Sequence, residues 1–573
     1  MIEKRWTIKE APDEKMLLAL ADSLNISNIL ATILILRGIT NFNEAKTYFR
    51  PDISLLHDPF LIDGMLSATN RIIDAITNNE KIVVYGDYDV DGTASAAILY
   101  LFLKELKANV EVHIPNRLTD GYGLSIDSIN LLSEQKTDLI ITVDCGITAV
   151  EEVDHANMLG IDVIISDHHK PKEIIPNAIA VLDPLKPGCN YPYKYLSGAG
   201  VAFKLARAVS DRVGRKNDML QYLDLVALAA AADIVPLTDE NRILVKRGME
   251  MINENPRPGI LALIKKAKKE LGGLTAGQLV FTIAPRINAV GRMGDAKRAV
   301  DLFIEKNIDE ADKIAQILED ENYQRRKIDE MTFSHAVSII EETVDLTKEV
   351  AIIIHVDEWH PGVIGIVASR VVEKYYRPAI MLSTVDGVAK GSARSIAGFN
   401  IYEALQECND MLIQFGGHEA AAGVAIEIEN IDKFRLKFNQ ILREKMKEKD
   451  IIPEIKADIA ISLSEITPKF IRILDQFAPF GPGNMRPVFV ATDVQLANYP
   501  RIVGSNHLLT TLKQEGSDKI FDAIGFNLGY FAESIAKDRD LIDIVFTIEK
   551  ISKNGILYPQ IRLKDIKVKE NVN

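Results

Sequence analysis

The chain has 573 residues, 47% of them hydrophobic and 26% charged, which is typical of a soluble globular protein with three or four domains. No apolar stretch is long enough to span a bilayer, and the charged N-terminus lacks a signal-peptide core, so membrane insertion and secretion are not expected. Three scattered cysteines exclude a disulfide framework or a zinc knuckle and favour the reducing cytoplasm.

The net charge of −14 argues against a nucleic-acid partner, because proteins that bind phosphates usually gather basic surface. Basic residues nevertheless cluster locally. The segment Lys550–Lys569 carries six of them against Asp565 alone, and Arg286–Arg298 carries four against Asp295 alone. Whole-chain acidity therefore leaves the partner open.

The N-terminal segment, residues 1–60, is predicted to form short helices at Glu14–Leu24, Asn28–Arg37 and Asn43–Tyr48. Residues 61–305 alternate apolar strand-like runs with helical stretches, a pattern that predicts a doubly wound parallel sheet. The expected strands lie at 81–85, 139–143, 163–166 and 179–182, and the first is followed by a helix at Thr93–Leu106.

The second half of the chain is predicted to hold three further parts. Residues 308–343 lack Gly and Pro, which predicts a long connecting helix within 306–345. A second α/β domain is expected at 346–450. Short β-rich runs at 451–573 suit a small β-barrel such as an OB-fold.

Acidic and imidazole side chains follow the apolar runs of the first α/β domain. Since parallel strands end at one edge of a sheet, these groups are expected to meet there. Mixed carboxylate and imidazole ligands suit a divalent cation, with Mn²⁺ favoured. The candidate residues are Asp87, Asp89, Asp91, Asp144, Asp167, His168, His169, Asp183 and Asp233.

Each cluster also has an ordinary interpretation. The loop 87–92 can simply cap the next helix through Asp91. An EF-hand also opens D-x-D-x-D-G but needs a glutamate six residues after the glycine, where this chain has Ile98, so that interpretation fails. The histidine pair at 168–169 can be a solvated surface feature, and Asp233 a helix-terminal turn residue.

Longer motifs accompany the clusters. The segment Asp167-His168-His169, together with 86–92 and 143–148, resembles the DHH phosphoesterase superfamily, and further motifs resemble its RecJ exonuclease branch. Those motifs lie at 113–123, 285–294, 360–370, 391–395, 416–423 and 479–484, so the resemblance runs nearly end to end. One departure is Tyr85, where other branches carry a metal-ligating histidine.

The resemblance implies hydrolysis of phosphodiester bonds at two Mn²⁺ or Mg²⁺ ions. The expected reaction removes mononucleotides from the 5′ end of single-stranded DNA during repair and recombination. His169 is expected to stabilise charge on the phosphoryl oxygens, and Asp183 only to buttress the site. The implied metal ligands are Asp87, Asp89, Asp91, Asp144, His168 and Asp233, of which Asp89, Asp91, Asp144, His168 and Asp233 also count with His169 as catalytic.

A pocket for the terminal phosphate is implied at residues 391–395. Ser392 can donate a hydrogen bond there and Arg394 can grip a phosphate bidentately, although such a loop is ordinarily just a turn. Further contacts to the strand are expected from Arg117, Tyr122, Arg286, Asn288, Arg292 and His418. The ordinary alternative for Arg286 and Arg292 is ion pairing with the acidic long helix.

The resemblance implies single-stranded DNA as substrate, and single-strand-binding protein and a RecQ-type helicase as partners. One alternative is a phosphoesterase for small substrates, which residues 455–573 disfavour because such relatives lack an OB-like domain. Another is a catalytically inactive scaffold, which the complete set of metal-ligand candidates disfavours.

Overall fold

The computed structural model describes residues 3–117, 121, 123–215, 218–447, 451–537, 541–553 and 556–569. The chain divides into two compact units. Unit 1 combines Glu3–Leu55 with Pro453–Asn573, and unit 2 is Leu56–Ile452. Among the described residues no single helix is long and apolar enough to cross a membrane. The helices Glu14–Leu24 and Asn28–Ile35 together have the length and apolar composition, but the chain bends by 114° between them.

Unit 2 begins with the predicted parallel sheet. Its five strands run in the order β3-β2-β4-β5-β6, and every neighbouring pair is parallel. The apolar runs that predicted the strands are buried within them. The strands are β2 (Lys81–Gly86), β3 (Asn109–His113), β4 (Leu139–Val143), β5 (Asp162–Ser166) and β6 (Ala180–Leu182).

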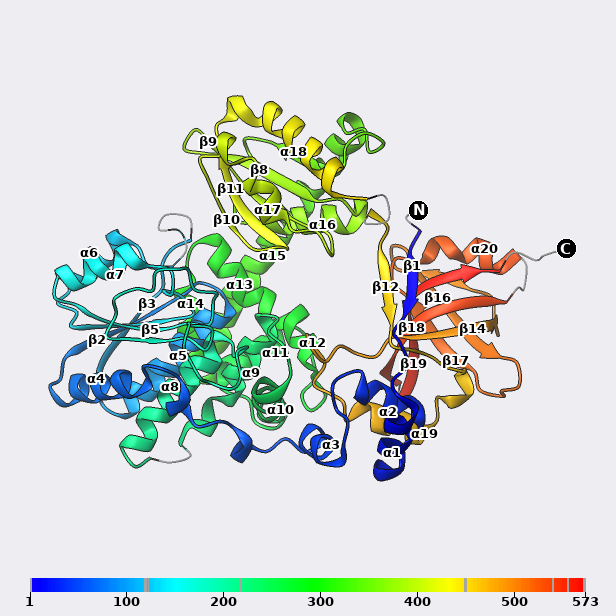
Figure 1. Ribbon diagram of the computed structural model, residues 1–573, viewed down its shortest axis with the longest axis horizontal. Coiled ribbons are helices and arrows are strands. Elements are labelled where there is room, and N and C mark those ends of the chain that lie inside the picture. The colour runs from blue at the N-terminus through cyan, green and yellow to red at the C-terminus, as the bar shows by residue number, and fades with distance from the viewer. Residues whose placement is uncertain are drawn as a thin grey trace. The chain divides into compact units, whose positions relative to one another are not determined.

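Helices cover both faces of this sheet, as expected of a doubly wound domain (Figure 1). α6 (Ile126–Glu134) and α7 (Val150–Met158) lie on one face, where Ile129 and Val153 join the core around Val83 and Tyr85. On the other side lie α4 (Met65–Thr77), α5 (Val90–Glu105), α8 (Gly198–Arg212), α9 (Leu223–Ala232) and α10 (Asp239–Glu254).

The alanine-rich α9 is buried along Leu223–Ala231, and small side chains let its neighbours approach closely. A Cβ on Gly248 of α10 would lie 2.0 Å from the Leu223 carbonyl oxygen. Only glycine therefore fits where these two helices touch. Unit 2 continues through α11 (Pro258–Lys266), α13 (Ala284–Met293) and α14 (Lys297–Ile304).

The predicted long helix is α15, Ile308–Thr343, whose 36 residues are capped by Asn307. After it comes a mixed sheet in the order β10-β11-β9-β8-β7, in which only the β7–β8 pair is parallel. Its elements are β7 (Ile352–His355), α16 (Ile364–Tyr375), β8 (Ala379–Val385), β9 (Val388–Arg394), α17 (Ile401–Gln406), β10 (Gln414–Gly417), β11 (Ala421–Ile426) and α18 (Ile431–Lys445).

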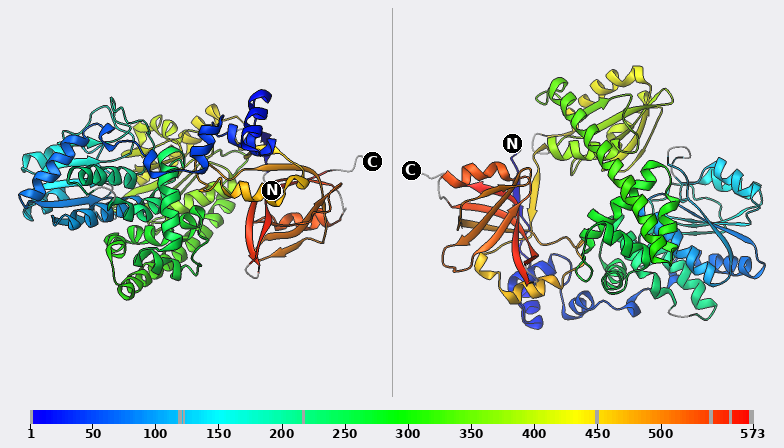
Figure 2. Two further views of the ribbon diagram at one scale, coloured as in Figure 1. Left: turned by 90° about the horizontal axis from the view of Figure 1, so that it is seen from below. Right: turned by 180° about the vertical axis from the view of Figure 1, so that it is seen from behind.

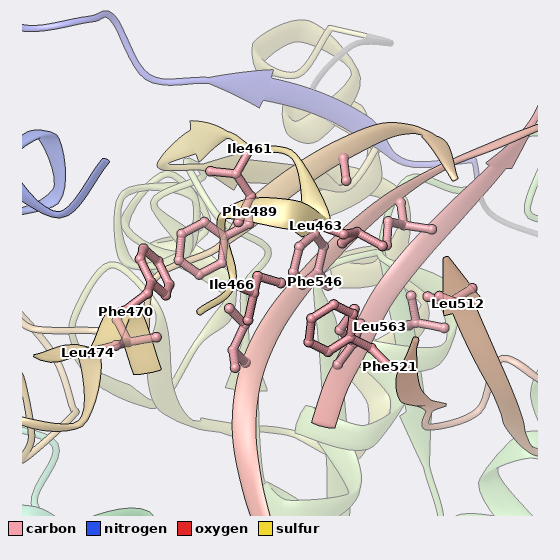
Figure 3. Close-up of a cluster of buried hydrophobic side chains, with 14 of the residues drawn as sticks. Ile461, Leu463, Ile466, Phe470, Leu474, Phe489, Leu512, Phe521, Phe546 and Leu563 are labelled. Atoms are coloured by element: carbon pink, nitrogen blue, oxygen red, sulfur yellow. The ribbon is translucent and has the colours of Figure 1, made fainter. Parts of the chain in front are cut away.

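In unit 1 the strands close on themselves. They pair around the ring β14-β18-β19-β17-β16, and β16 pairs back onto β14, which is the five-stranded closure of an OB-fold. The strands curve around one apolar core, formed by residues such as Phe489, Phe521 and Phe546 (Figures 2 and 3). The ring strands are β14 (Phe489–Leu496), β16 (His507–Gln514), β17 (Phe521–Gly525), β18 (Ile542–Lys553) and β19 (Ile556–Val568).

The N-terminal helices form as predicted, at α1 (Glu14–Leu24), α2 (Asn28–Ile35) and α3 (Phe42–Phe49). Their apolar faces join the barrel core instead of forming one of their own. A strand that was not predicted, β1 (Arg5–Ile8), pairs in parallel with β12 (Glu454–Ala457). Residues nearly 450 positions apart in the sequence thus share one fold.

A polar contact fixes this association. Asn484 lies in the loop before β14, where its Oδ1 accepts hydrogen bonds from Arg37 Nε at 2.9 Å and from the Tyr48 hydroxyl at 2.8 Å. Its amide nitrogen donates to the carbonyl oxygens of Phe477 and Pro479. Because Asn484 is buried, losing either partner would leave a polar group without compensation.

Candidate metal centre

Four of the predicted clusters lie where neighbouring parallel strands end. Asp87 follows β2, Asp144 follows β4, Asp167 follows β5 and Asp183 follows β6. These strands are adjacent and parallel, so their carboxyl ends form one edge of the sheet. Asp233 reaches the same place from the C-terminal end of α9.

The side chains converge into three overlapping groups, in each of which the candidate ligand atoms lie within 4.8 Å of one another. His168 links two of the groups: its Nε2 lies 3.0 Å from Asp144 Oδ1, 3.6 Å from Asp233 Oδ2 and 3.9 Å from Asp91 Oδ2. The groups are Asp144 with His168 and His169, Asp91 with His168 and Asp233, and Asp87 with Asp89 and Asp144.

The loop after β2 is held by its own backbone and by a neighbouring helix. Asp89, not Asp91, caps α5, because its Oδ1 accepts hydrogen bonds from the backbone N–H groups of Asp91 and Gly92. Both carboxylate oxygens of Asp91 accept instead from the first backbone N–H groups of α8, Gly198 and Ala199, at 2.7 Å each. Asp91 is thus anchored by a helix N-terminus.

Asp144 adopts a left-handed backbone conformation, with φ of 61°, directly after β4. A non-glycine residue in this region carries strain, which concentrates at functional sites. Helix α8 presses against it, since a Cβ on Gly198 would lie 2.7 Å from both Cβ and Oδ1 of Asp144. The glycine permits this approach.

Asp167 organises the two histidines, a role that the sequence prediction missed. Its Oδ1 accepts hydrogen bonds from the backbone of His168 at 2.7 Å and from His169 Nδ1 at 2.8 Å, and its Oδ2 accepts from the backbone of Ile147 at 3.0 Å. Burial alone would raise the pKa of Asp167, but the hydrogen bond from His169 and the nearby imidazoles lower it to about 2.

The two histidines consequently differ. Burial and the charge of His169 lower the pKa of His168 to about 4, which leaves a neutral imidazole suited to metal binding. Burial would lower the pKa of His169 too, but its hydrogen bond to Asp167 and the surrounding carboxylates raise it to about 9. His169 is therefore the cationic member of the pair.

The carboxylates crowd a buried space. Burial and then the charge of Asp89 raise the pKa of Asp91 to about 7, and burial and then Asp91 raise the pKa of Asp233 to about 9. Burial followed by neighbouring aspartates likewise raises the pKa of Asp87 and Asp144. Such a cluster is unfavourable unless cations neutralise it.

The donor set fits divalent cations. Asp87 Oδ1 and His168 Nε2 are buried and form no hydrogen bond with the described residues. Five carboxylates and one neutral imidazole match the oxygen and nitrogen ligands that Mn²⁺ and Mg²⁺ accept. Asp183 stands outside the three groups: its Oδ1 accepts from the backbone of Leu185, and burial raises its pKa to about 7.

Basic side chains gather beside the metal loop. The Arg117 guanidinium lies 5.0 Å from the ring centroid of Tyr88, which stands between Asp87 and Asp89. Burial and then the charges of Arg117, Arg325 and Arg394 lower the pKa of Arg292 to about 10. Residues 391–395, predicted as a loop, instead belong to strand β9 as far as Arg394, where pairing with β8 and β11 keeps the backbone extended. There Arg394 Nη1 donates to Ser392 Oγ at 2.7 Å.

The remaining residues that were predicted to contact the substrate differ in their surroundings from this arginine cluster. Arg286 is paired with Glu319 of α15, which is the ordinary alternative stated for it. Asn288 Oδ1 accepts from the backbone of Val90 at 3.1 Å and so holds the metal loop. His418 is exposed at the end of β10, and Tyr122 lies outside the described residues.

Tyr85 is the residue that departs from the superfamily pattern, and its side chain contacts Gly123 and His113. Its hydroxyl donates to the Gly123 carbonyl oxygen at 3.0 Å, and its ring packs 4.9 Å from that of His113.

Comparison with known proteins identifies the family. Residues 81–230 match the DHH family N-terminal domain, 349–444 the DHHA1 domain and 457–565 the RecJ OB domain. The single-stranded-DNA-specific exonuclease RecJ of Bacillus subtilis is 38% identical over 99% of this chain and 71% of its own length. The chain belongs to the RecJ family. Escherichia coli RecJ is 35% identical over 82% of this chain and 84% of its own length.

A solved RecJ has the same architecture. The Thermus thermophilus RecJ structure in complex with Mn²⁺ superposes with a TM-score of 0.83 at 28% identity, covering 99% of this chain and 80% of that one. A second structure of that protein holds Mg²⁺ and gives a TM-score of 0.77 at 27% identity. Crystals of that RecJ therefore hold Mn²⁺, which the donor set favours, and Mg²⁺, which the family resemblance also implies.

Proposed function

We propose that this chain is a metal-dependent exonuclease that hydrolyses single-stranded DNA from the 5′ end and releases mononucleotides in DNA repair and recombination. The observation that carries the proposal is the meeting, within unit 2, of a buried carboxylate and imidazole centre with the cluster of Arg117, Arg292 and Arg394. The names of the RecJ relatives support single-stranded DNA as the substrate.

Asp87, Asp89, Asp91, Asp144, His168 and Asp233 would hold two Mn²⁺ or Mg²⁺ ions. When bound, such ions lower the pKa of a coordinated water and neutralise charge on the phosphate under attack. The chain's own residues supply the orientation: the N-terminus of α8 anchors Asp91, and Asp89 caps α5.

His169 would act on the phosphoryl group itself. Its Nδ1 donates to Asp167, which fixes the ring, so Nε2–H is the group that would reach a phosphoryl oxygen. Burial lowers the pKa of this ring, but the hydrogen bond to Asp167 and the surrounding carboxylates raise it to about 9, and a protonated ring would stabilise negative charge that develops there.

A pocket that recognises the end of the strand would set the polarity. Ser392 and Arg394, with Arg117 and Arg292, present a hydroxyl and three guanidinium groups suited to a 5′-phosphate. Direct contact with the substrate remains a prediction for Arg286, Asn288 and His418. The hydrogen bonds of Arg286 to Glu319 and of Asn288 to Val90 favour structural roles for these two residues. The OB-fold of unit 1 would bind the strand farther along.

The predicted domain limits, 1–60, 61–305, 306–345, 346–450 and 451–573, are kept as part of this proposal. So are the cytoplasmic location and the contacts with single-strand-binding protein and a RecQ-type helicase. The contacts with these two proteins are supported by the family resemblance alone.

The test is digestion of a single strand labelled separately at each end, with Mn²⁺, by the wild type and by Asp144→Ala and Arg394→Ala. Early mononucleotide release from the 5′ label, abolished by the aspartate change and weakened by the arginine change, is the expected result. Release from the 3′ label would contradict the proposed 5′-phosphate pocket but would still support the metal centre. DNA binding without hydrolysis by the wild type would favour the scaffold.

A further inference from the structure

Helix α13 sits directly on the metal loop. Asn288 Oδ1 accepts a hydrogen bond from the backbone N–H of Val90 at 3.1 Å. One turn later, a Cβ on Gly291 would lie 2.4 Å from the carbonyl oxygen of Tyr88. Tyr88 and Val90 alternate with the candidate ligands of the same loop, so a shift of α13 must move that loop or break these contacts.

The C-terminal end of α13 touches the second α/β domain. Arg292 Nη1 donates to the Gly362 carbonyl oxygen at 3.0 Å, and a Cβ on Gly362 would lie 2.6 Å from the Arg292 carbonyl oxygen. Three residues later, a Cβ on Gly365 would lie 3.0 Å from both Arg394 Nη2 and Ser392 Oγ.

Three glycines, at 291, 362 and 365, therefore replace side chains at successive steps between the phosphate pocket and the metal loop. At Gly291 and Gly362 the nearest atoms are backbone carbonyl oxygens, which do not absorb small displacements as flexible side chains would, because close-packed interiors have low compressibility and transmit strain. At Gly365 the nearest atoms are those of the pocket side chains Arg394 and Ser392 themselves. The two sites are joined by a short and stiff series of contacts.

We propose that α13 couples the terminal-phosphate pocket to the metal loop, so that a bound 5′-phosphate raises turnover as well as affinity. The proposal rests on the function proposed above. Asn288 and Gly291 are positioning residues, which act through Val90 and Tyr88. Binding energy from a remote substrate group is then used at the reacting centre, and a substrate that lacks the group loses kcat and not only KM.

The experiment compares two strands of one sequence, with a 5′-phosphate or a 5′-hydroxyl, and measures kcat and KM for release of the first nucleotide alone, because in the proposed reaction each cut leaves a strand that itself carries a 5′-phosphate. For the wild type we expect the phosphate to raise kcat by about 5-fold or more, as is usual for coupled sites. Asn288→Ala removes the acceptor for Val90 N–H and should bring the kcat ratio close to one. Its affinity for the phosphorylated strand, measured in EDTA, should change by less than about twofold because the pocket is intact.

Three variants serve as controls. Asn288→Asp keeps an acceptor oxygen and should restore the kcat ratio. Gly291→Ala pushes on the Tyr88 carbonyl and should lower the ratio, which provides a second test if Asn288→Ala fails to fold. Gly277→Ala adds a Cβ that meets nothing closer than 4.0 Å and should behave as the wild type.

Several outcomes would overturn the coupling. An equal fall of kcat on both strands would show general damage to the metal loop. A rise of KM on both strands would show that Asn288 contacts the substrate directly. If the wild type has the same kcat with and without the 5′-phosphate, the two sites are not coupled. Failure of the proposed function differs from all of these, since the wild type would then hydrolyse neither strand.

Discussion

Asp167 belongs to none of the three ligand groups, yet it holds both adjacent histidines. Its carboxylate accepts from the backbone N–H of both residues and from His169 Nδ1, so one side chain fixes the backbone of the pair and the ring of His169. Against the effect of burial, Asp167 raises the pKa of His169, whereas burial and the charge of His169 lower the pKa of His168. In the proposed mechanism His168 would bind a metal ion and His169 would contact the phosphate. Partners that orient metal ligands in this way are usually needed for full activity.

Asp167→Asn should lower kcat by about 10–100-fold, because it removes the charge that holds His169 protonated and lets the ring turn. Mn²⁺ affinity should fall less than kcat, since the ligands themselves are unchanged. Steady-state kinetics with a labelled strand and a Mn²⁺ titration measure the two effects. Asp154→Asn, at an exposed position of α7 away from the centre, is the control, and an equal loss of kcat in that variant would contradict the role given to Asp167.

Several residue roles could not be predicted from the sequence because they depend on contacts between distant segments. Asp167 stands in the motif, but nothing in the chain distinguishes a residue that orients ligands from a ligand. Asn288 lies in an arginine-bearing segment and was predicted to contact substrate, whereas the fold places it against Val90. The pairing of Arg286 with Glu319 was foreseen only as an alternative.

Among the elements, α8 links the fold to the chemistry most directly. Its first backbone N–H groups bind Asp91, and its first glycine lies against Asp144. The helix therefore determines the distance between two candidate ligands on different loops. A side chain at its N-terminus would separate them.

Gly198→Ala should weaken Mn²⁺ binding strongly while leaving the protein folded, since alanine favours the helix but its Cβ would lie 2.7 Å from Asp144. Gly200→Ala, on the same helix, meets only the Leu196 side chain at 3.3 Å and should bind Mn²⁺ nearly as the wild type does. Isothermal titration with Mn²⁺ and a thermal melt measure binding and folding. Equal Mn²⁺ affinity in the two variants would show that the contact with Asp144 is unimportant.

Most elements could be predicted from the sequence because their signals are local. The apolar runs before Asp87 and Asp144 are long enough to indicate buried strands, and the stretch without Gly or Pro gave the bounds of α15, Ile308–Thr343. The strand β1 could not be predicted, because four residues become a strand only when β12 is beside them. The closure of the barrel by the β14–β16 pair is equally non-local.

At the scale of the whole molecule, unit 1 is discontinuous, with unit 2 inserted between its two segments. The N-terminal segment supplies helices to the barrel core and the partners of Asn484. The stability of the barrel should thus depend on residues at the opposite end of the chain. The two tryptophans allow this to be measured, because Trp6 lies in unit 1 and Trp359 in unit 2.

Arg37→Met should destabilise unit 1 by about 1–3 kcal/mol, because it leaves the buried Asn484 without one of its donors. In a Trp359→Phe background, Trp6 fluorescence during urea unfolding should report a lower midpoint. In a Trp6→Phe background, Trp359 should report no change. Arg472→Met, at an exposed position of α19 (Pro468–Asp475), is the control; a similar loss there would contradict the argument.

The parallel pairing of β1 with β12 also imposes an order on synthesis. Strand β1 leaves the ribosome long before its partner strand, which follows about 450 residues later, and at about 5–20 residues per second this is a delay of about 20–90 s. During that interval unit 2 can fold, while the apolar faces of α1 and α2 stay uncovered because the barrel core against which they pack has not yet been made. These helices are therefore made long before they reach their final place, and until then their apolar faces are exposed to aggregation and to chaperones.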